Sequence, residues 1–250
     1  MIDTIIVSGG NIQNGFALDF LRKNIEKAGR ENLRLIAADK GLEFFMEVSS
    51  GKKELFGFSS EKEEFFSGSA ELGLLPDIAV GDFDSLSEKG KLFLSQEEEL
   101  GNMEIIRLKP EKDDSDTQSA AVLAMNRESR DIVILGGTGT RLDHVLANLG
   151  LLSLGWSLGA HISLVDENNY ITLVENGTIL KRNEQFGKYV SFFPVGGDVG
   201  GLTLKGFQYP LSDYCLTVSD SGLTVSNEIA EETAEITYES GVLLMIMSRD

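Results

Sequence analysis

The sequence predicts an α/β chain in which an open parallel-sheet, Rossmann-like domain is followed by an all-β sandwich domain. Up to about residue 166, short apolar runs alternate with stretches of helical periodicity, which is typical of a parallel sheet with helices packed on it. Beyond residue 168, short extended runs follow one another, separated by Gly, Ser, Asp and Asn. The 250 residues suffice for two modest domains, and we place these at residues 1–168 and 169–250.

Six strands are expected in the first domain. They cover residues 4–8, 33–38, 78–80, 105–108, 132–135 and 161–165. Ala17, Leu21 and Ile25 recur at helical spacing after the first strand, and Gly29 is a stop signal for that helix. Residues 49–70 form an unusually long connection, to which we assign no function.

The second domain is expected to consist of short strands joined by turns. Asn176 and Gly177 are a strong hairpin signal between residues 171–174 and 178–180. The further strands are expected at residues 189–193, 202–204, 215–218, 223–225, 235–238 and 242–247. This spacing favours a sandwich or barrel.

Composition restricts the partners of the chain. The net charge of −18 argues against binding to nucleic acid or to anionic membrane surfaces, and it favours a cationic small molecule. Cys215 is the single cysteine, so no internal disulfide or zinc cluster is expected. The sequence has no run long enough to span a membrane and no secretion signal at its start. We therefore expect a cytoplasmic protein that binds neither nucleic acid nor membrane.

Two carboxylates follow the third predicted strand, in the run P-D-I-A-V-G-D-F-D-S from residue 76 to residue 85. Asp82 and Asp84 point to the same side if the backbone stays extended there. Ser85 and Glu88 form a capping-box pattern that predicts the start of a helix at Ser85. Mg²⁺ is often held by one or two such carboxylates together with substrate phosphates. The alternative is that both acids only stabilise the start of the helix.

Polar groups also follow the fourth and fifth strands. Asp113 and Asp116 are three residues apart and therefore neighbours on a helix. A purely structural role is strongly indicated as well, because Ser115 and Gln118 make another capping box and acids suit a helix N-terminus. The glycine-rich loop from residue 136 to residue 144 exposes N–H groups that can hold a phosphate, but it matches neither a P-loop nor G-x-G-x-x-G. Within it, Arg141 offers donors for phosphate oxygens and Asp143 adds a carboxylate.

The predicted strands bring several acids to one edge of the sheet. Each of them follows a strand at its carboxyl end, where open α/β sheets bind ligands. They are Asp39, Asp82, Asp84, Asp116 and Asp143. Clustered carboxylates repel one another, and a divalent cation offsets that repulsion.

Six short motifs occur in a fixed order along the chain. They are A-D-K-G at 38–41, P-D-I-A-V-G-D-F-D-S at 76–85, K-D-D-S-D at 112–116, G-T-R-L-D-H at 139–144 with Asn148, G-F-Q-Y-P-L at 206–211 and S-N-E at 226–228. In this order the motifs are similar to those of the thiamine pyrophosphokinase (thiamine diphosphokinase) family. The likeness covers most of the chain and is specific as a set.

The resemblance implies an activity and an assembly. The family transfers the diphosphoryl group of ATP to the hydroxyl of thiamine with Mg²⁺, giving AMP and thiamine diphosphate. The resemblance also implies a homodimer whose active sites lie between the subunits. Residues 1–168 would then be the nucleotide- and metal-binding catalytic domain, and residues 169–250 the domain for thiamine binding and dimerisation.

The resemblance also assigns roles to single residues. Those expected in catalysis are Asp82, Asp84, Asp113 and Asp116, of which Asp82, Asp84 and Asp116 hold the metal and Asp113 is a candidate base. Those expected at ATP are Asp39, Gly139, Arg141 and Asp143. Those expected at thiamine are Tyr209, Ser226 and Asn227, with the tyrosine ring stacked on the pyrimidine or the thiazolium.

Some residues depart from the family's pattern. Lys40, Leu42, Glu43, Ser115 and Thr140 replace its usual residues, and Thr140 could tighten the nucleotide loop. Two other functions use similar features: a Mg²⁺-dependent phosphatase or nucleotide-sugar transferase with a D-x-D acid pair, and a non-catalytic sensor of thiamine or nucleotide. A phosphatase of the haloacid dehalogenase type carries D-x-D after its first strand, whereas here the pair follows the third.

Overall fold

The computed structural model describes residues 1–50, 74–109, 114–139, 141–220 and 222–250. These residues form two compact units, Met1–Glu167 and Asn168–Asp250. The predicted excursion at 49–70 lies almost entirely outside the described residues, as do Asp113 and Thr140.

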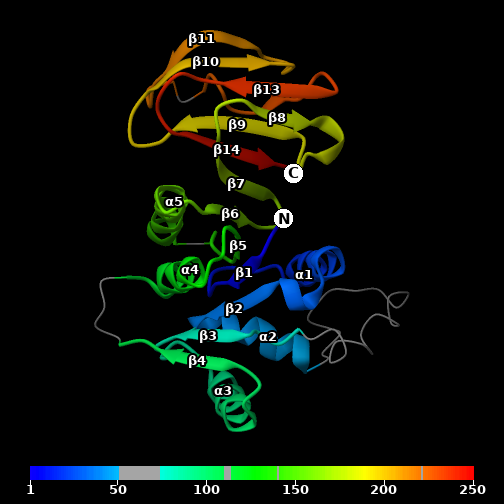
Figure 1. Cartoon of the computed structure of the whole chain (residues 1–250), viewed down its shortest axis with the longest axis vertical. Coiled ribbons are helices and arrows are strands. Elements are labelled where there is room, and N and C mark those ends of the chain that lie inside the picture. The colour runs from blue at the N-terminus through cyan, green and yellow to red at the C-terminus, as the bar shows by residue number, and fades with distance from the viewer. Residues whose placement is uncertain (51–73, 110–113, 140, 221) are drawn as a thin grey trace. The chain divides into compact units, whose positions relative to one another are not determined.

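The first unit contains a parallel six-stranded run in the order β6-β5-β1-β2-β3-β4 (Figure 1). The strands are β1 (Thr4–Val7), β2 (Arg34–Ala38), β3 (Ile78–Gly81), β4 (Glu104–Arg107), β5 (Asp131–Leu135) and β6 (His161–Val165). Chain order proceeds from β1 to β4 on one side of β1 and then continues with β5 on its other side. The carboxyl ends of β1 and β5 therefore flank a topological switch point, where open α/β sheets bind ligands.

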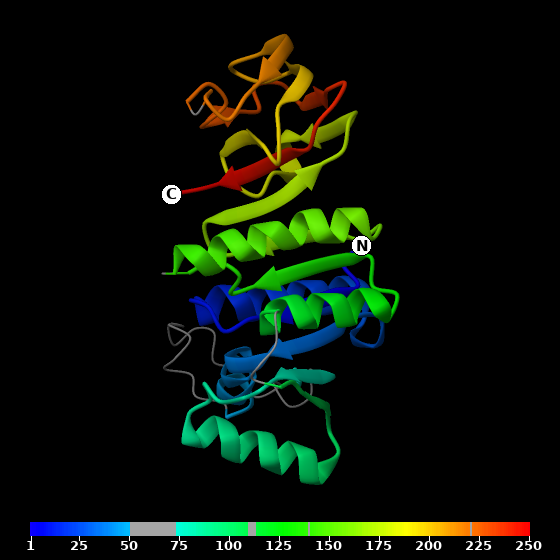
Figure 2. The same cartoon turned by 90° about the vertical axis from the view of Figure 1, so that its left-hand side faces the viewer.

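Helices cover both faces of this parallel sheet. The α-helices are α1 (Asn14–Ala28), α2 (Leu42–Ser49), α3 (Glu88–Leu100), α4 (Asp116–Asn126) and α5 (Leu142–Ser157). In the two views, α1 and α2 lie on one face and α4 and α5 on the other (Figure 2). Burial on both faces explains why the strand sequences are continuously apolar rather than alternating. The predicted α/β class is confirmed.

Two helices, α2 and α3, differ from the sequence expectations. The α2 helix was not predicted, because its eight residues give too short a periodic signal, although Leu42, Phe45 and Val48 are buried. The helix expected to start at Ser85 begins at Glu88, and its N-cap is Ser87, whose side chain accepts from the N–H of Gly90. The prediction at Ser85 was therefore wrong.

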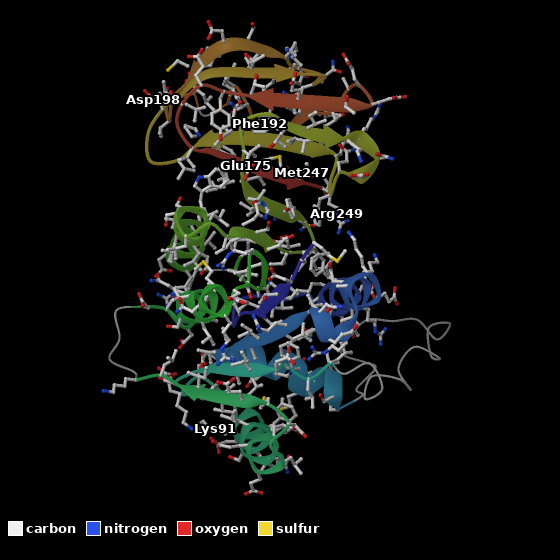
Figure 3. All side chains as sticks on the ribbon, viewed as in Figure 1. Lys91, Glu175, Phe192, Asp198, Met247 and Arg249 are labelled. Carbon is white, nitrogen blue, oxygen red and sulfur yellow. The ribbon has the colours of Figure 1, made fainter. Side chains whose placement is uncertain are left out.

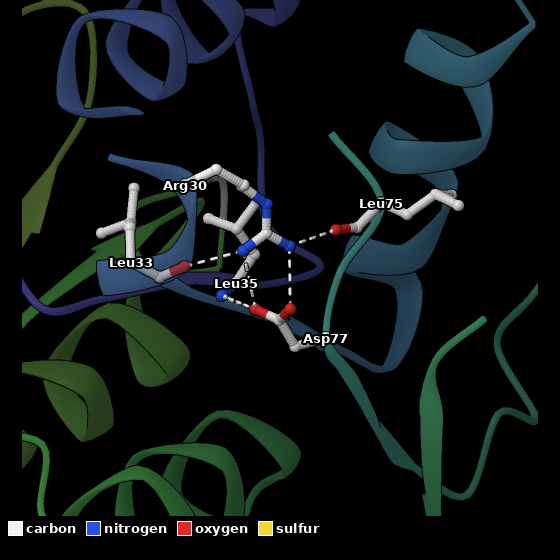
Figure 4. A network of polar contacts seen from close by, with 5 residues as sticks. All are labelled: Arg30, Leu33, Leu35, Leu75 and Asp77. Carbon is white, nitrogen blue, oxygen red and sulfur yellow. Dashed lines mark hydrogen bonds and ion pairs between the residues drawn. The ribbon is translucent and has the colours of Figure 1, made fainter. Parts of the chain in front are cut away.

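Arg30 and Asp77 tie the amino ends of β2 and β3 together (Figure 4). The Asp77 carboxylate accepts from both terminal nitrogens of Arg30, at 2.8 and 3.2 Å, and from the N–H of Leu35 at 2.7 Å. The same guanidinium donates to the carbonyl oxygens of Leu33 and Leu75. This network lies at the strand edge opposite the acids and gives Asp77, in the P-D motif, a structural role.

The second unit is a sandwich of antiparallel strands, in the orders β12-β9-β14-β7 and β11-β10-β13-β8. The strands are β7 (Asn169–Val174), β8 (Thr178–Lys181), β9 (Tyr189–Pro194), β10 (Val199–Lys205), β11 (Leu211–Leu216), β12 (Asn227–Glu228), β13 (Thr233–Thr237) and β14 (Leu243–Ser248). Phe192 and Met247 belong to its core (Figure 3). There the rings of Phe192 and Phe207 meet edge to face, with their centres 5.6 Å apart.

Two predictions in this unit were wrong, one of a hairpin and one of a strand. Asn176 and Gly177 do make a turn, but β7 pairs with β14 and β8 with β13, so the turn connects two sheets instead of forming a hairpin. Residues 223–225, expected as a strand, are a turn. There the Thr224 hydroxyl is buried and donates to the Phe192 carbonyl, and this bond fixes the segment against β9 without strand pairing.

Candidate active site

Three carboxylates converge where β2 and β3 end. Asp39 follows β2, and Asp82 and Asp84 follow β3. One carboxylate oxygen of each lies within 4.8 Å of the other two. We call these three residues the acid cluster. Such a set of oxygen donors suits a hard divalent cation.

The backbone between Asp82 and Asp84 is not extended, so the assumption that the two acids alternate as in a strand was wrong. Phe83 has a φ of 61°, in the left-handed region. Its ring is buried, with the Arg107 guanidinium 5.7 Å from the ring centre. The N–H of Asp84 donates to the Asp82 carboxylate at 3.1 Å. The two acids therefore converge through a tight turn that buries the intervening phenylalanine, and not through strand alternation.

The two carboxylate oxygens of Asp39 have different surroundings. The hydroxyl of Ser85 donates to its Oδ2, whereas its buried Oδ1 has no hydrogen-bond partner in the described part of the chain. Burial raises the pKa of Asp39, and the nearby charges of Asp116 and Asp82 raise it further. A buried, unpartnered carboxylate oxygen beside other acids is costly unless a cation neutralises it. The residues present therefore fit a divalent metal ion.

Asp116 lies at the first position of α4, close enough for its charge to affect Asp39. Ser115 caps this helix, because its side chain accepts from the N–H of Gln118 at 3.2 Å. Asp116 is not part of the group of three that lies within 4.8 Å. It faces instead, with Asp39 and Ser85, a neighbouring cavity.

A cavity of about 580 Å³ opens at the switch point between β1 and β5. Its lining includes residues 8–11, 38–40, 115–117 and 136–139, with Ser85, Arg141, His144 and Asn148. This size matches small-molecule and cofactor sites, which span about 300–1,000 Å³. Gly139, Asp39 and Arg141, all expected at a nucleotide, are thus brought to one cavity.

Glycines allow the loops after β1 and β5 to touch. A Cβ atom on Gly10 would lie 2.2 Å from the carbonyl oxygen of Gly136, which itself has a φ of 70°. The buried Asn148 side chain donates to the Gly137 carbonyl at 2.7 Å and fixes the second loop. The loop of residues 8–11 was missed as a site from the sequence. Its signal was the pair of glycines after the first strand, which gains meaning only when the strand order is known.

Arg141 and Asp143 form an exposed ion pair at the start of α5. The guanidinium contacts the carboxylate through two bonds, at 2.5 and 3.1 Å. This contact lowers the pKa of Asp143 to about 2. Asp143 lies outside the acid cluster, so its charge holds Arg141 rather than adding to the group of three.

The second unit brings Tyr209, Ser226 and Asn227 together. The buried Asn227 amide donates to the Tyr209 carbonyl at 2.8 Å and accepts from the Tyr209 N–H at 2.9 Å. The tyrosine side chain is 61% exposed. Ser226 has a φ of 56°, and its N–H donates to the Ser191 hydroxyl at 2.9 Å. The amide of Asn227 thus holds the backbone of an exposed aromatic residue.

Comparisons with known proteins give one family. Residues 26–162 match the model of the thiamin pyrophosphokinase catalytic domain, and residues 177–243 that of its vitamin B1 binding domain. The thiamine pyrophosphokinase of Bacillus subtilis (strain 168) is 33% identical over 180 residues, which cover 72% of this chain and 82% of the relative.

Solved structures agree with these matches. The crystal structure of the Bacillus subtilis thiamine pyrophosphokinase has a TM-score of 0.75 at 28% identity, covering 99% of both chains. That of the Geobacillus thermodenitrificans thiamin pyrophosphokinase has a TM-score of 0.72 at 27% identity, covering 100% of this chain and 98% of the other. Among the described residues, no helix is long and apolar enough to cross a membrane.

Proposed function

The chain belongs to the thiamin pyrophosphokinase family, which transfers the diphosphoryl group of ATP to thiamine, and we propose that the acid cluster and its neighbouring cavity carry out this transfer. The observation that carries the proposal is the unpartnered, buried Oδ1 of Asp39, which lies among carboxylates beside a cavity at the switch point. ATP occupies that cavity. Thiamine binds at Tyr209, Ser226 and Asn227.

Mg²⁺ is the metal that we assign to the acids. Asp82 and Asp84 would hold it together with Asp39, and Asp116, the other acid expected at the metal, would face it from the neighbouring cavity. When bound, Mg²⁺ supplies positive charge that neutralises both the carboxylates and the phosphate oxygens. The high negative charge of the chain is consistent with this assignment, because a phosphate chain would otherwise be repelled from the cluster.

The chain's own residues position the reactants. The thiamine hydroxyl oxygen forms a bond to the β-phosphorus of ATP while the bond from that phosphorus to the α–β bridging oxygen breaks, so AMP leaves. Phosphoryl transfer of this kind depends on positioning and on neutralising charge more than on covalent chemistry. Arg141 and the glycine loop orient the phosphates, and Asp113 remains our candidate for taking the hydroxyl proton.

Product analysis separates this function from the alternatives. Incubation of the protein with ATP, thiamine and Mg²⁺ is expected to give AMP and thiamine diphosphate in equal amounts. ADP would indicate transfer of one phosphate, and free phosphate a hydrolase. Binding of both substrates without any product would indicate a sensor.

The exposed ring of Tyr209 is expected to contribute to thiamine binding. Tyr209→Ala should raise the KM for thiamine about 5- to 10-fold, because aromatic contact with a cation contributes roughly 1 kcal/mol or more. The KM for ATP should stay unchanged. Ile179→Ala, which removes an exposed apolar side chain elsewhere in the same unit, is the matched control. Steady-state kinetics with each substrate varied in turn measure both constants.

Asn227→Ala tests the support of the tyrosine in the same assay. It should raise the KM for thiamine and also lower the free energy of unfolding by about 1–3 kcal/mol, because backbone groups of Tyr209 and Glu228 lose their buried partner. If Tyr209→Ala and Asn227→Ala lower stability without changing the KM for thiamine, the assignment of thiamine to this unit is wrong.

A homodimer is the assembly that we propose. Leu142 and Leu146, one turn apart on α5, are 74% and 68% exposed, and exposed apolar groups of this kind mark interaction sites. Sedimentation should give a dimer, and replacing both leucines by Glu should give monomers. In mixed dimers of Asp82→Asn and Tyr209→Ala subunits, a wild-type KM for thiamine would show that the site is shared, because unshared sites would keep the raised KM of Tyr209→Ala. A fully active monomer would contradict the proposal.

A further inference from the structure

Lys40 lies on the wall of the switch-point cavity, one residue after Asp39. Its side chain is exposed to solvent. In the sequence, Lys40 stands out only as a departure from the family's pattern, with no role attached to it. Because Lys40 lies next to the acid cluster and a glycine loop of the cavity, it is a candidate for contact with the substrate.

The backbone fixes where the lysine side chain begins. A Cβ atom on Gly9 would lie 2.8 Å from the Cβ of Lys40, so this lysine stands directly against the loop that follows β1. The same loop touches the glycine loop after β5. The side chain of Lys40 therefore starts beside Asp39 of the acid cluster and against the glycine loops that line the cavity.

Lys40 and Arg141 are two cations on the cavity lining, and they differ in whether an acid pairs with them. Arg141, another cation on the lining, is engaged by Asp143 through two bonds. Within residues 1–50, 74–109 and the other described ranges, the Lys40 ammonium makes no ion pair or hydrogen bond. Three nearby acids, Asp39, Asp82 and Asp84, do not neutralise it by contact. A cation that is kept in a ligand cavity without a protein partner is available to an anionic ligand.

We propose that the Lys40 ammonium binds a phosphate oxygen of the nucleotide. This rests on the proposed function, which places ATP in this cavity. Lysine acts on phosphates as a flexible point charge with three donors, so arginine can substitute for its charge but not for its shape. A contact of this kind acts on the phosphate chain and leaves the nucleoside untouched.

Equilibrium binding tests the contact with two probes in the presence of Mg²⁺. One probe is α,β-methylene ATP, which resists the transfer, and the other is adenosine, which has no phosphate. Lys40→Ala should weaken binding of the ATP analogue roughly 10- to 100-fold, as expected for hydrogen bonds to charged groups, and leave adenosine binding unchanged. Lys40→Arg should recover most of the lost affinity. Lys27→Ala, which removes an exposed lysine at the end of α1, should bind both probes as the wild type does.

The outcomes separate this inference from the proposed function. Equal weakening of both probes by Lys40→Ala would mean a structural role, and unchanged affinity for both would mean no contact; either result overturns the inference. If the wild-type protein binds the ATP analogue but forms no AMP from ATP and thiamine, the proposed activity fails while the comparison of Lys40 variants still stands. If the wild type does not bind the analogue, both are overturned.

Discussion

Replacing Asp82 by asparagine is expected to lower kcat by about a thousandfold while the protein stays folded. A metal ion contributes several kcal/mol to stabilising charge in such reactions, and each 1.36 kcal/mol corresponds to a factor of ten in rate. Asparagine is nearly isosteric with aspartate and keeps the oxygen that accepts from the N–H of Asp84, but it removes one negative charge from the acid cluster. The loss should therefore appear in catalysis and in Mg²⁺ affinity.

Stability measurements separate this effect from misfolding. The charge of Asp82 contributes to the raised pKa of Asp39, which shows that the two carboxylates repel one another. In metal-free protein, Asp82→Asn should thus unfold at the same or a higher temperature than the wild type. Asp198→Asn, an exposed substitution in the second unit, should change neither rate nor stability. Near-normal turnover of Asp82→Asn at saturating Mg²⁺ would contradict the role of the cluster.

Replacing Gly10 by alanine is expected to lower kcat/KM for ATP by about 100-fold, without changing the KM for thiamine. The new Cβ atom would lie 2.2 Å from the carbonyl oxygen of Gly136 and 2.8 Å from that of Thr138. Both are backbone atoms, so the loops after β1 and β5 have to separate. A displacement of about 1 Å in a substrate-positioning element can cost a factor of this size.

The matched control for this prediction is Gly197→Ala. A Cβ atom there meets nothing within 4 Å, and the variant should behave as the wild type in both assays. Gly10→Ala should also lose about 1–3 kcal/mol of unfolding free energy, as overpacked sites do. Urea unfolding and kinetics with varied ATP measure the two effects. An unchanged kcat/KM for ATP in Gly10→Ala would mean that the nucleotide does not lie on these loops.

The alternation of apolar strands and helical stretches was enough to predict the class of both units and most strands. It worked because a parallel sheet buries both faces, and its strands then read as continuous apolar runs. Strand order is not encoded in such a pattern. The switch point beside β1 therefore stayed hidden, and with it the contribution of Gly9 and Gly10 to the cavity.

Local turns were harder to predict than strands. Phe83 has a left-handed backbone and a buried ring, although phenylalanine has no preference for this region of φ and ψ. The turn at Asn176 and Gly177 was correctly expected, but whether its flanking strands pair depends on the partners β13 and β14, which come much later in the chain. Ser85 resembled a helix cap, but its hydroxyl donates a hydrogen bond to the Asp39 carboxylate.

For the site residues, the position along the sheet could be predicted, but the contacts of each side chain could not. Acids that follow strands could be placed at one edge, because all strands of a parallel sheet end there. What each acid contacts could not be inferred from spacing: Asp143 pairs with Arg141, while Asp39 keeps a buried oxygen without a partner. Likewise the resemblance to the family suggested Asn227 as a thiamine contact, and only the structure reveals its bonds to the backbone of Tyr209.

Locating the metal tests the central assignment most directly. Crystals grown with Mn²⁺ and α,β-methylene ATP can be measured at an X-ray wavelength where manganese scatters anomalously. We predict a peak within bonding distance of carboxylate oxygens of Asp39, Asp82 and Asp84, next to the phosphates of the analogue in the cavity between β1 and β5. The same measurement on Asp82→Asn should give a weaker peak or none. A manganese peak away from these three aspartates, with the analogue bound in the cavity, would contradict the assignment.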